Sequence, residues 1–261
     1  MLIDFHTHIW PDALAPSAMA TLSAEGGIPG FYDGTVAGLR TSMREAGIDR
    51  SVVQPVATKP GQVRTINDWV ATLASDDVVP FGAMHPELED PAGELARMAA
   101  LGLRGFKMHP EYQSFSPDDP RLDALFDAAA SLGMILFSHA GADIGPQTIN
   151  GTPEVFARLL DRHPTLTVVL AHMGGFRQWH DVGANLTGRD VYLDTAFTLG
   201  HLPDEEFVAL VRAHGAERVL FGSDGPWTDP VAEIAHLRSM PLTESELDSI
   251  LGGTAARLLA W

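Results

Sequence analysis

The chain has 261 residues, no cysteine and a formal net charge of −17, from 17 lysines and arginines against 34 aspartates and glutamates. Such an acidic surface repels phosphate backbones and anionic lipids, so we expect neither nucleic acid nor a membrane as a partner. No apolar run reaches the roughly 18 residues of a membrane helix, and the lack of cysteine excludes thiolate ligands and a thiol nucleophile. We expect a cytoplasmic protein, because the first strand pattern leaves no room for a signal peptide.

Eight short apolar runs predict the strands of the fold. They lack a clean alternation of polar and apolar residues, which is typical of parallel strands buried on both faces. The first lies within residues 1–10, and the others span residues 51–57, 78–84, 103–108, 134–138, 166–171, 191–195 and 218–223.

Amphipathic segments rich in alanine and leucine alternate with these runs, and we predict helices over 35–46, 119–132, 152–162 and 203–214. Residues 11–34 read as a long loop with a short helix, and two further helices near 244–251 and 254–259 finish the chain. Alternating strands and helices over about 250 residues predict a (β/α)8 TIM barrel. We expect one domain over residues 1–261, with a C-terminal helical extension, since no linker divides the chain.

His6 and His8 form a His-x-His pair at the end of the first predicted strand. Side chains in a strand repeat with a period of two, so both imidazoles point to the same side. Two neutral imidazoles on one rigid element supply half of a four-ligand metal site. The alternative is a pair of histidines satisfied by hydrogen bonds.

Further polar side chains follow the other predicted strands at their C-terminal ends. Barrels of this kind carry their active sites at that end of the strands. With His85, six of the eleven histidines lie at such positions, which favours a common site. The remaining candidates at these ends are Lys107, His109, His139, His172, Asp194 and Asp224.

Four motifs carry a family resemblance: DFHTH (residues 4–8), FSHAG (137–141), LAHMG (170–174) and FGSDGP (221–226). In this order they resemble the amidohydrolase superfamily, and within it the amidohydrolase-related branch that is similar to aminocarboxymuconate-semialdehyde decarboxylase. The ending GGTAARL (252–258) resembles that branch's closing helix, with Gly-Thr in place of Gly-Asn. The resemblance covers residue 3 to about residue 259.

This resemblance implies one divalent metal, most often zinc, with manganese as an alternative. The ligands that it implies are His6, His8, His139 and Asp224. It also implies that His172 is the catalytic acid or base and that Asp224 takes a proton as well as binding the metal. Three imidazoles and a carboxylate suit zinc, and an open coordination position lowers the pKa of a bound water towards neutrality.

Lys107 leaves three interpretations open. In the binuclear branch of the superfamily a lysine at this strand is carboxylated and bridges two metals, which would add a second metal here. Lys107 can instead hold a substrate carboxylate as an ammonium, or pair with a carboxylate such as Asp194 or Glu111. Asp194 can in turn orient a ligand histidine.

We expect Trp10, Trp227, His109 and Arg177 to contact a small-molecule substrate, because they fall in predicted loops or turns after strands. Arg177 can bind a substrate anion or lie solvated in its loop, and His109 can merely shape the turn before Pro110. Loop aromatics are also common at protein interfaces, so they can serve a homodimer instead.

Three functions are compatible with these residues. The first is a hydrolase in which metal-activated water attacks the carbonyl of an amide, ester or lactone. The second is a metal-dependent nonoxidative decarboxylase of a small unsaturated or aromatic acid, which would use the same ligands. The third is a non-catalytic barrel that binds a metal or ligand. The compact chain and its short loops favour the hydrolase.

Overall fold

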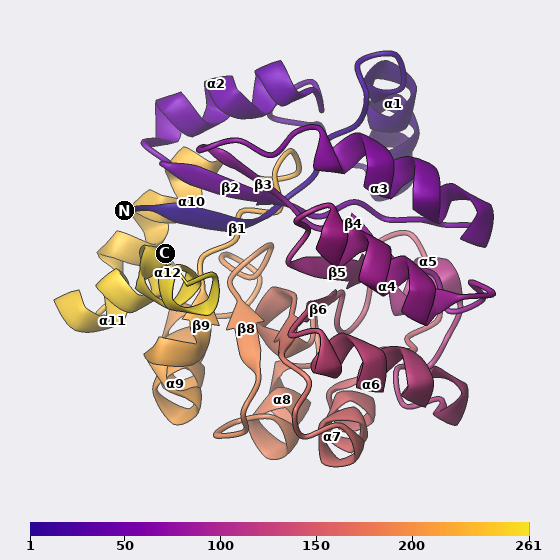
Figure 1. The fold of residues 1–261 in the computed structure, drawn as a ribbon. Coiled ribbons are helices and arrows are strands. Elements are labelled where there is room, and N and C mark those ends of the chain that lie inside the picture. Colours follow the sequence, from indigo (N-terminus) through magenta and orange to yellow (C-terminus); the bar gives the residue numbers. More distant parts are fainter. Residues whose placement is uncertain (261) are drawn as a thin grey trace.

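The structure is a computed structural model that describes residues 1–260, and it confirms the predicted barrel (Figure 1). Parallel strands form its wall, with β1, β2 and β3 adjacent in one sheet and β4 to β9 in sequential order in the other. The strands are β1 (Ile3–Thr7), β2 (Arg50–Val53), β3 (Val78–Pro80), β4 (Gly82–Ala83), β5 (Gly105–Met108), β6 (Ile135–Ser138), β7 (Val168–Leu170), β8 (Tyr192–Asp194) and β9 (Val219–Leu220).

The two sheets join at β3 and β4, which are two halves of one strand. Only Phe81 separates them, and its N–H donates to the carbonyl of Val53 on β2 at 3.0 Å. The strand therefore changes its hydrogen-bonding neighbour without leaving the wall. This interruption follows Pro80, which has no N–H to give to a ladder.

The last strand returns to the first and closes the barrel. The N–H of Phe5 donates to the carbonyl of Phe221 at 2.8 Å, and the N–H of Asp224 donates to the carbonyl of His6 at 2.9 Å. Beyond them, the N–H of His8 donates to the carbonyl of Gly225 at 2.6 Å. The seam therefore continues past the end of β9 into the segment that carries Asp224.

Helices surround the strands in Figure 1 and cover the outside of the barrel. α1 has 12 residues and is longer than the short helix expected in this region. Thr35 and Thr152 cap α2 and α7, each accepting a backbone N–H of the first turn. The helices are α1 (Ala15–Gly26), α2 (Val36–Ala46), α3 (Val63–Ala71), α4 (Pro91–Ala100), α5 (Pro110–Gln113), α6 (Asp123–Ser131), α7 (Pro153–Arg162), α8 (Trp179–Asn185), α9 (Asp204–His214), α10 (Pro230–Ser239), α11 (Glu244–Asp248) and α12 (Thr254–Leu258).

An apolar cluster fills one part of the barrel interior. Phe5, Phe81 and Phe137 lie in it, with the rings of Phe5 and Phe81 edge to face at 5.7 Å. Ala255 of α12 and Leu259, which follows that helix, join the same cluster, so the predicted helical extension packs against the strands. Because apolar side chains fill this part of the interior, the polar side chains of the strands lie at the carboxyl ends.

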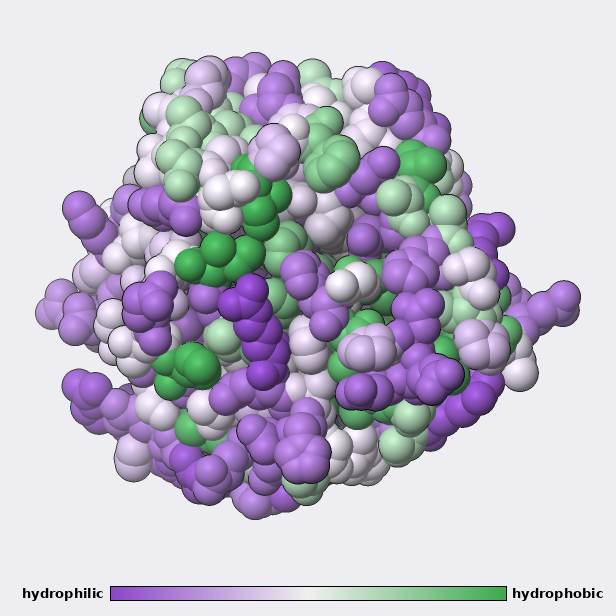
Figure 2. Space-filling view, turned by 180° about the vertical axis from the view of Figure 1, so that it is seen from behind, coloured by the Kyte–Doolittle hydropathy of each residue, from purple (hydrophilic) through white to green (hydrophobic). Residues whose placement is uncertain are grey.

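Hydrophilic side chains (purple) cover most of the rim of the face in Figure 2, and apolar ones (green) gather nearer its centre. This distribution agrees with the acidic composition of the chain. Among residues 1–260, no helix has both the length and the apolar character needed to cross a membrane.

Asn67 of α3 links two helices to the wall. Its side-chain oxygen accepts the N–H of Ala83 at 2.7 Å, and its Nδ2 donates to the carbonyl of Ala83 at 3.1 Å and to Glu94 of α4 at 2.8 Å. Both Asn67 and Glu94 are fully buried. One amide therefore satisfies both backbone groups at the short strand β4.

We predict that Asn67→Ala lowers the free energy of unfolding by about 2–3 kcal/mol, because it leaves the buried N–H and carbonyl of Ala83 without partners. Urea unfolding measures this loss. Asn185→Ala is the matched control: the Asn185 amide bonds only within its own exposed helical turn, so we expect a change below about 0.5 kcal/mol. Equal effects of the two substitutions would contradict the role of Asn67.

Candidate metal centre and substrate cavity

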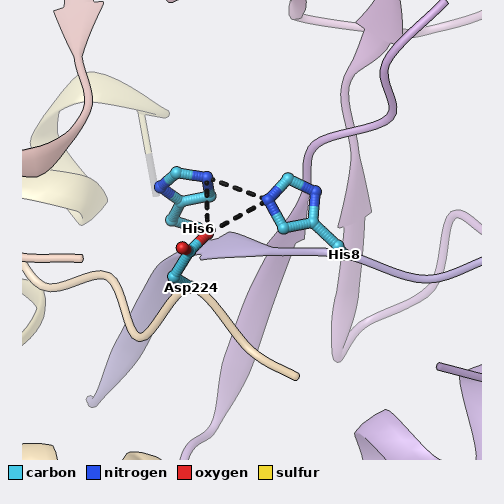
Figure 3. A group of neighbouring side chains, drawn as sticks. All are labelled: His6, His8 and Asp224. Atoms are coloured by element: carbon cyan, nitrogen blue, oxygen red, sulfur yellow. Dashed lines mark hydrogen bonds and ion pairs between the residues drawn. The ribbon is translucent and has the colours of Figure 1, made fainter. Parts of the chain in front are cut away.

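Three side chains converge where β1 meets the segment after β9 (Figure 3). The Nε2 atoms of His6 and His8 lie 3.1 Å apart, and Asp224 Oδ1 lies 3.2 Å from the first and 3.1 Å from the second. His6 is 1% exposed. The predicted His-x-His pair therefore points to one side and meets a carboxylate that is 216 residues away in the chain.

Hydrogen bonds on the far side of both rings assign their protons. His8 Nδ1 lies 2.8 Å from the carbonyl of Gln54, which can only accept, so Nδ1 carries the proton. His6 Nδ1 lies 2.8 Å from Asp194 Oδ2 and donates to it. The neutral form of each ring then has a bare Nε2 that faces Asp224.

This arrangement fits a divalent cation. Two bare nitrogens and a carboxylate oxygen would repel one another at about 3 Å without a positive charge between them. Burial, together with the charge of Lys107, lowers the pKa of His6 well below its usual value, so an extra proton on His6 does not resolve the repulsion. Ligand atoms of a tetrahedral metal at about 2.0–2.1 Å stand about 3.3 Å apart, close to the spacing found here.

His139 and His172 form a second pair beside the first group. His172 Nδ1 donates to the carbonyl of Ala196 at 2.8 Å, and His139 Nε2 donates to the carbonyl of Ala142 at 3.1 Å. Their other ring nitrogens face each other at 3.1 Å. The resemblance implied that His139 completes the ligand set with His6, but here it faces His172 and stands outside the group of His6, His8 and Asp224.

The backbone is strained at two candidate residues. His172 (φ 58°) and Asp224 (φ 61°) both have a left-handed backbone conformation that residues other than glycine rarely adopt. Trp179 Nε1 donates to the carbonyl of His172 at 3.0 Å, and Asp194 Oδ1 accepts the N–H of His172 at 2.8 Å. Strain of this kind is typical of functional positions that their surroundings hold in place.

Lys107 extends from β5 into the same centre and is 1% exposed. Its Nζ lies 3.5 Å from His6 Nε2 and 4.3 Å from the centre of the Phe137 ring. Burial lowers the pKa of its ammonium. No ion pair within 4.0 Å joins Lys107 to a carboxylate among the described side chains, so the pairing with Asp194 or Glu111, one of the three interpretations, is not formed.

Asp4 is the first residue of the DFHTH motif, and no role was predicted for it from the sequence. Its Oδ1 accepts the N–H groups of His6 (3.1 Å) and Ser223 (3.0 Å), and its Oδ2 accepts the Ser223 hydroxyl at 2.5 Å. Burial raises the pKa of Asp4 to about 7, against the lowering effect of these bonds. Asp4 thus fixes the position of Asp224 relative to His6.

A cavity of about 620 Å³ opens over these groups. Trp10 and Trp227 line it, with ring centres 6.3 Å apart. Arg177 does not line it: this side chain is exposed and lies over the ring of Phe176. The remaining apolar lining includes Leu14, Leu22, Ile66, Trp69, Tyr112, Phe176 and Phe197.

His109 also lines the cavity and belongs to a third polar group that the sequence did not reveal. Its ring stacks on His139 at 4.2 Å, and its Nε2 lies 3.3 Å from Asp143 Oδ2. Glu111 lies behind both rings and accepts the N–H groups of Asn150 and Gly151. Asp143 lies in an irregular segment after β6, where the sequence gives no periodicity to mark it.

The amidohydrolase family model matches residues 3–261 of the chain. A 2-amino-3-carboxymuconate-6-semialdehyde decarboxylase of Dictyostelium discoideum is 26% identical over 74% of this chain, and the match spans only 65% of that protein's length.

Two solved structures show the same fold. An uncharacterized TIM-barrel protein of Bordetella bronchiseptica has a TM-score of 0.81 at 22% identity, covering 99% of this chain and 98% of the other. A 5-carboxyvanillate decarboxylase of Novosphingobium aromaticivorans, solved with bound manganese, has a TM-score of 0.77 at 14% identity, covering 100% and 97%. Both likenesses support the barrel as the architecture.

We predict that His109 in the metal-free protein takes up a proton only near pH 4, since burial lowers its pKa to about 4. In the unfolded chain the pKa of the same group is about 6.5. Between these values the unfolded state binds the proton first, so this group makes stability fall as the pH falls from about 6.5 to 4.

Histidine NMR titration measures the pKa of His109 directly, with His109→Gln to assign the signal. The free energy of unfolding of that variant should also fall less steeply than that of the wild type as the pH falls from about 6.5 to 4. The two slopes should differ by at most about 1.4 kcal/mol per pH unit. His180→Gln, an exposed change on α8, should leave the slope as it is. A His109 signal that titrates near pH 6.5 would contradict the burial effect.

Proposed function

The chain belongs to the amidohydrolase family, and within it we propose a metal-dependent, nonoxidative decarboxylase of a small unsaturated or aromatic acid. The observation that carries the proposal is the convergence of His6 Nε2, His8 Nε2 and Asp224 Oδ1 to within 3.2 Å of one another. These three residues would hold the metal. His139 is the proposed fourth ligand and would have to turn its free nitrogen from His172 towards that group.

The relatives support decarboxylation over hydrolysis. Both named enzymes among them are decarboxylases, one of which was solved with manganese. We expected a hydrolase because the chain is compact, but the alignment covers 97% of the manganese-containing decarboxylase, so length gives no reason to prefer hydrolysis. Manganese and zinc both accept imidazole and carboxylate ligands.

A bound divalent cation would supply positive charge that orients the substrate and draws electron density from the reacting centre. Lys107 would hold the substrate carboxylate, because its buried Nζ lies beside the three converging atoms and has no carboxylate partner among the described residues. The rings of Trp10 and Trp227 would cover a flat substrate and exclude water. The cavity thus has charged side chains at the centre, around Lys107, and apolar side chains along the rest of its wall.

Decarboxylation breaks the bond between carbon and the carboxylate, releases carbon dioxide and leaves the electron pair on carbon, which then takes a proton. His172 is the proposed proton donor, because its Nε2 is free to carry a proton while Nδ1 stays bonded to Ala196. Burial lowers the pKa of His172, and the charge of Asp224 opposes that effect. Asp224 is the proposed group that returns the proton. No water is consumed in this reaction.

The test uses metal-loaded protein and a panel of small unsaturated and aromatic acids that includes 2,6-dihydroxybenzoate, assayed in deuterium oxide. We expect carbon dioxide release, with deuterium on the carbon that lost it. Amide, ester and lactone substrates assayed in parallel test hydrolysis. Turnover of these compounds alone, with the acids untouched, would overturn the proposal in favour of the hydrolase.

We predict that His6→Ala loses bound manganese or zinc, measured by elemental analysis on purified protein, because it removes one of three converging ligand atoms. His236→Ala, on exposed helix α10, is the control and should retain full metal. Full metal content in His6→Ala would remove the proposed ligand set. Two equivalents in the wild type would instead favour a carboxylated Lys107 and a second metal.

We predict a different result for His172→Ala. It should keep its metal and lose about 100-fold or more in kcat, as expected for removal of a general acid. Metal content, measured on the same sample as the rate, separates a catalytic loss from a lost cofactor. A variant that turns over at the wild-type rate would remove the proposed role of His172.

A further inference from the structure

The geometry points to Asp143 as the residue that selects the second polar group of the substrate, favouring acids that also carry a hydroxyl or amino donor and disfavouring acids with a second carboxylate. This inference rests on the proposed function, which supplies the first carboxylate and its binding groups.

The charged groups of the cavity wall are few. Apart from histidines, Lys107 is the one cationic side chain among the described residues that line it, and Asp143 and Asp224 are the acidic ones. Asp224 and Lys107 belong to the centre already described. Asp143 is therefore the charged side chain left to meet the rest of the substrate.

Asp143 is held rigidly as a hydrogen-bond acceptor. His109 Nδ1 accepts the N–H of Tyr112, so the proton of the neutral ring lies on Nε2 and points to Asp143 Oδ2 at 3.3 Å. The N–H of Gly145 donates to Asp143 Oδ1 at 2.9 Å. Because protons already fill these contacts, the group formed by His109, His139 and Asp143 needs no cation of its own.

Acceptor capacity remains on Asp143. Each carboxylate oxygen has about two lone-pair positions, and these contacts use one on each oxygen. The side chain is 15% exposed and lines the cavity. Burial raises its pKa, but the hydrogen bonds from His109 and the Gly145 N–H, together with the nearby imidazoles, outweigh that effect and lower the pKa below its usual value, so the carboxylate is ionised. It can accept from a hydroxyl or amine but repels another anion.

Asp143 also lies within reach of a small molecule at the centre. His139 connects the two places: its Nε2 is 3.7 Å from Asp143 Oδ2, and its Nδ1 is 3.1 Å from His172 Nε2. The ring of Tyr112 and the side chain of Ile144 flank this part of the wall with apolar surface. A flat acid that binds the centre at one end can therefore place a donor against Asp143.

The experiment measures binding by titration calorimetry on metal-loaded protein, so it does not depend on turnover. The probes are benzoate, 3- and 4-hydroxybenzoate, their methoxy counterparts, and the benzene-1,3- and 1,4-dicarboxylates. In the wild type we expect at least one hydroxybenzoate to bind about tenfold tighter than its methoxy counterpart, and the dicarboxylates to bind more weakly than benzoate.

Asp143→Asn should remove the hydroxyl preference and strengthen binding of a dicarboxylate about tenfold while leaving benzoate unchanged. These opposite changes for the two kinds of probe cannot arise from partial unfolding, because partial unfolding weakens the binding of every probe. Glu25→Gln is the control: it removes the same charge at exposed helix α1, outside the cavity lining, and should behave as the wild type.

Two results would overturn the inference. One is a wild type that binds methoxy and hydroxy compounds equally, and the other is an Asp143→Asn variant with unchanged ratios. Failure of benzoate and all the other acids to bind would overturn the proposed function itself, and this inference with it. If Asp143→Asn loses metal or melts early, Asp143→Ala replaces it, with the same expected loss of hydroxyl preference.

Discussion

The buried carboxylate of Asp194 is the constraint on which the centre depends. One of its oxygens accepts from His6 Nδ1, and the other accepts the N–H groups of His172 and Ala196. Ala196 in turn accepts the proton of His172 Nδ1. A single fully buried side chain on β8 therefore sets the tautomer of one histidine and the backbone position of another. Burial raises the pKa of Asp194, while the bonds from His172 and the charge of Lys107 lower it, so a cation in the centre would favour its ionised form.

The barrel could be predicted from the sequence because its strands are continuous apolar runs and its helices carry caps. Thr152 followed by Pro153 is a local signal, and α7 begins there. Pro80 marks the point where one strand is split, but the hydrogen bond from Phe81 to Val53 joins distant segments and has no local signal. The length of α1 was also missed, since the glycines and prolines around it indicate a loop more strongly than a helix.

The candidate site was partly predictable for a similar reason. His6, His8 and Asp224 follow strands directly, and strand ends in a barrel meet, so position alone brings them together. The ring orientation of His139 depends on Ala142 and His172, which only the folded chain places around it. Asp143 acts from an irregular segment and Trp179 from the first residue of α8, whereas Arg177, in the turn before α8, is exposed. Sequence position cannot distinguish these cases.

The seam between β1 and the segment after β9 has a consequence for how the chain folds. The hydrogen bonds that close the barrel, from Asp224 to His6 and from His8 to Gly225, belong to the same residues whose side chains converge in the centre. The centre therefore cannot exist before the last strand docks, and a chain emerging from the ribosome must extend beyond Gly225 before this segment can meet β1. Contacts of such sequence separation slow folding. Any cation bound between His8 and Asp224 would bind the closed barrel alone and so stabilise closure by mass action.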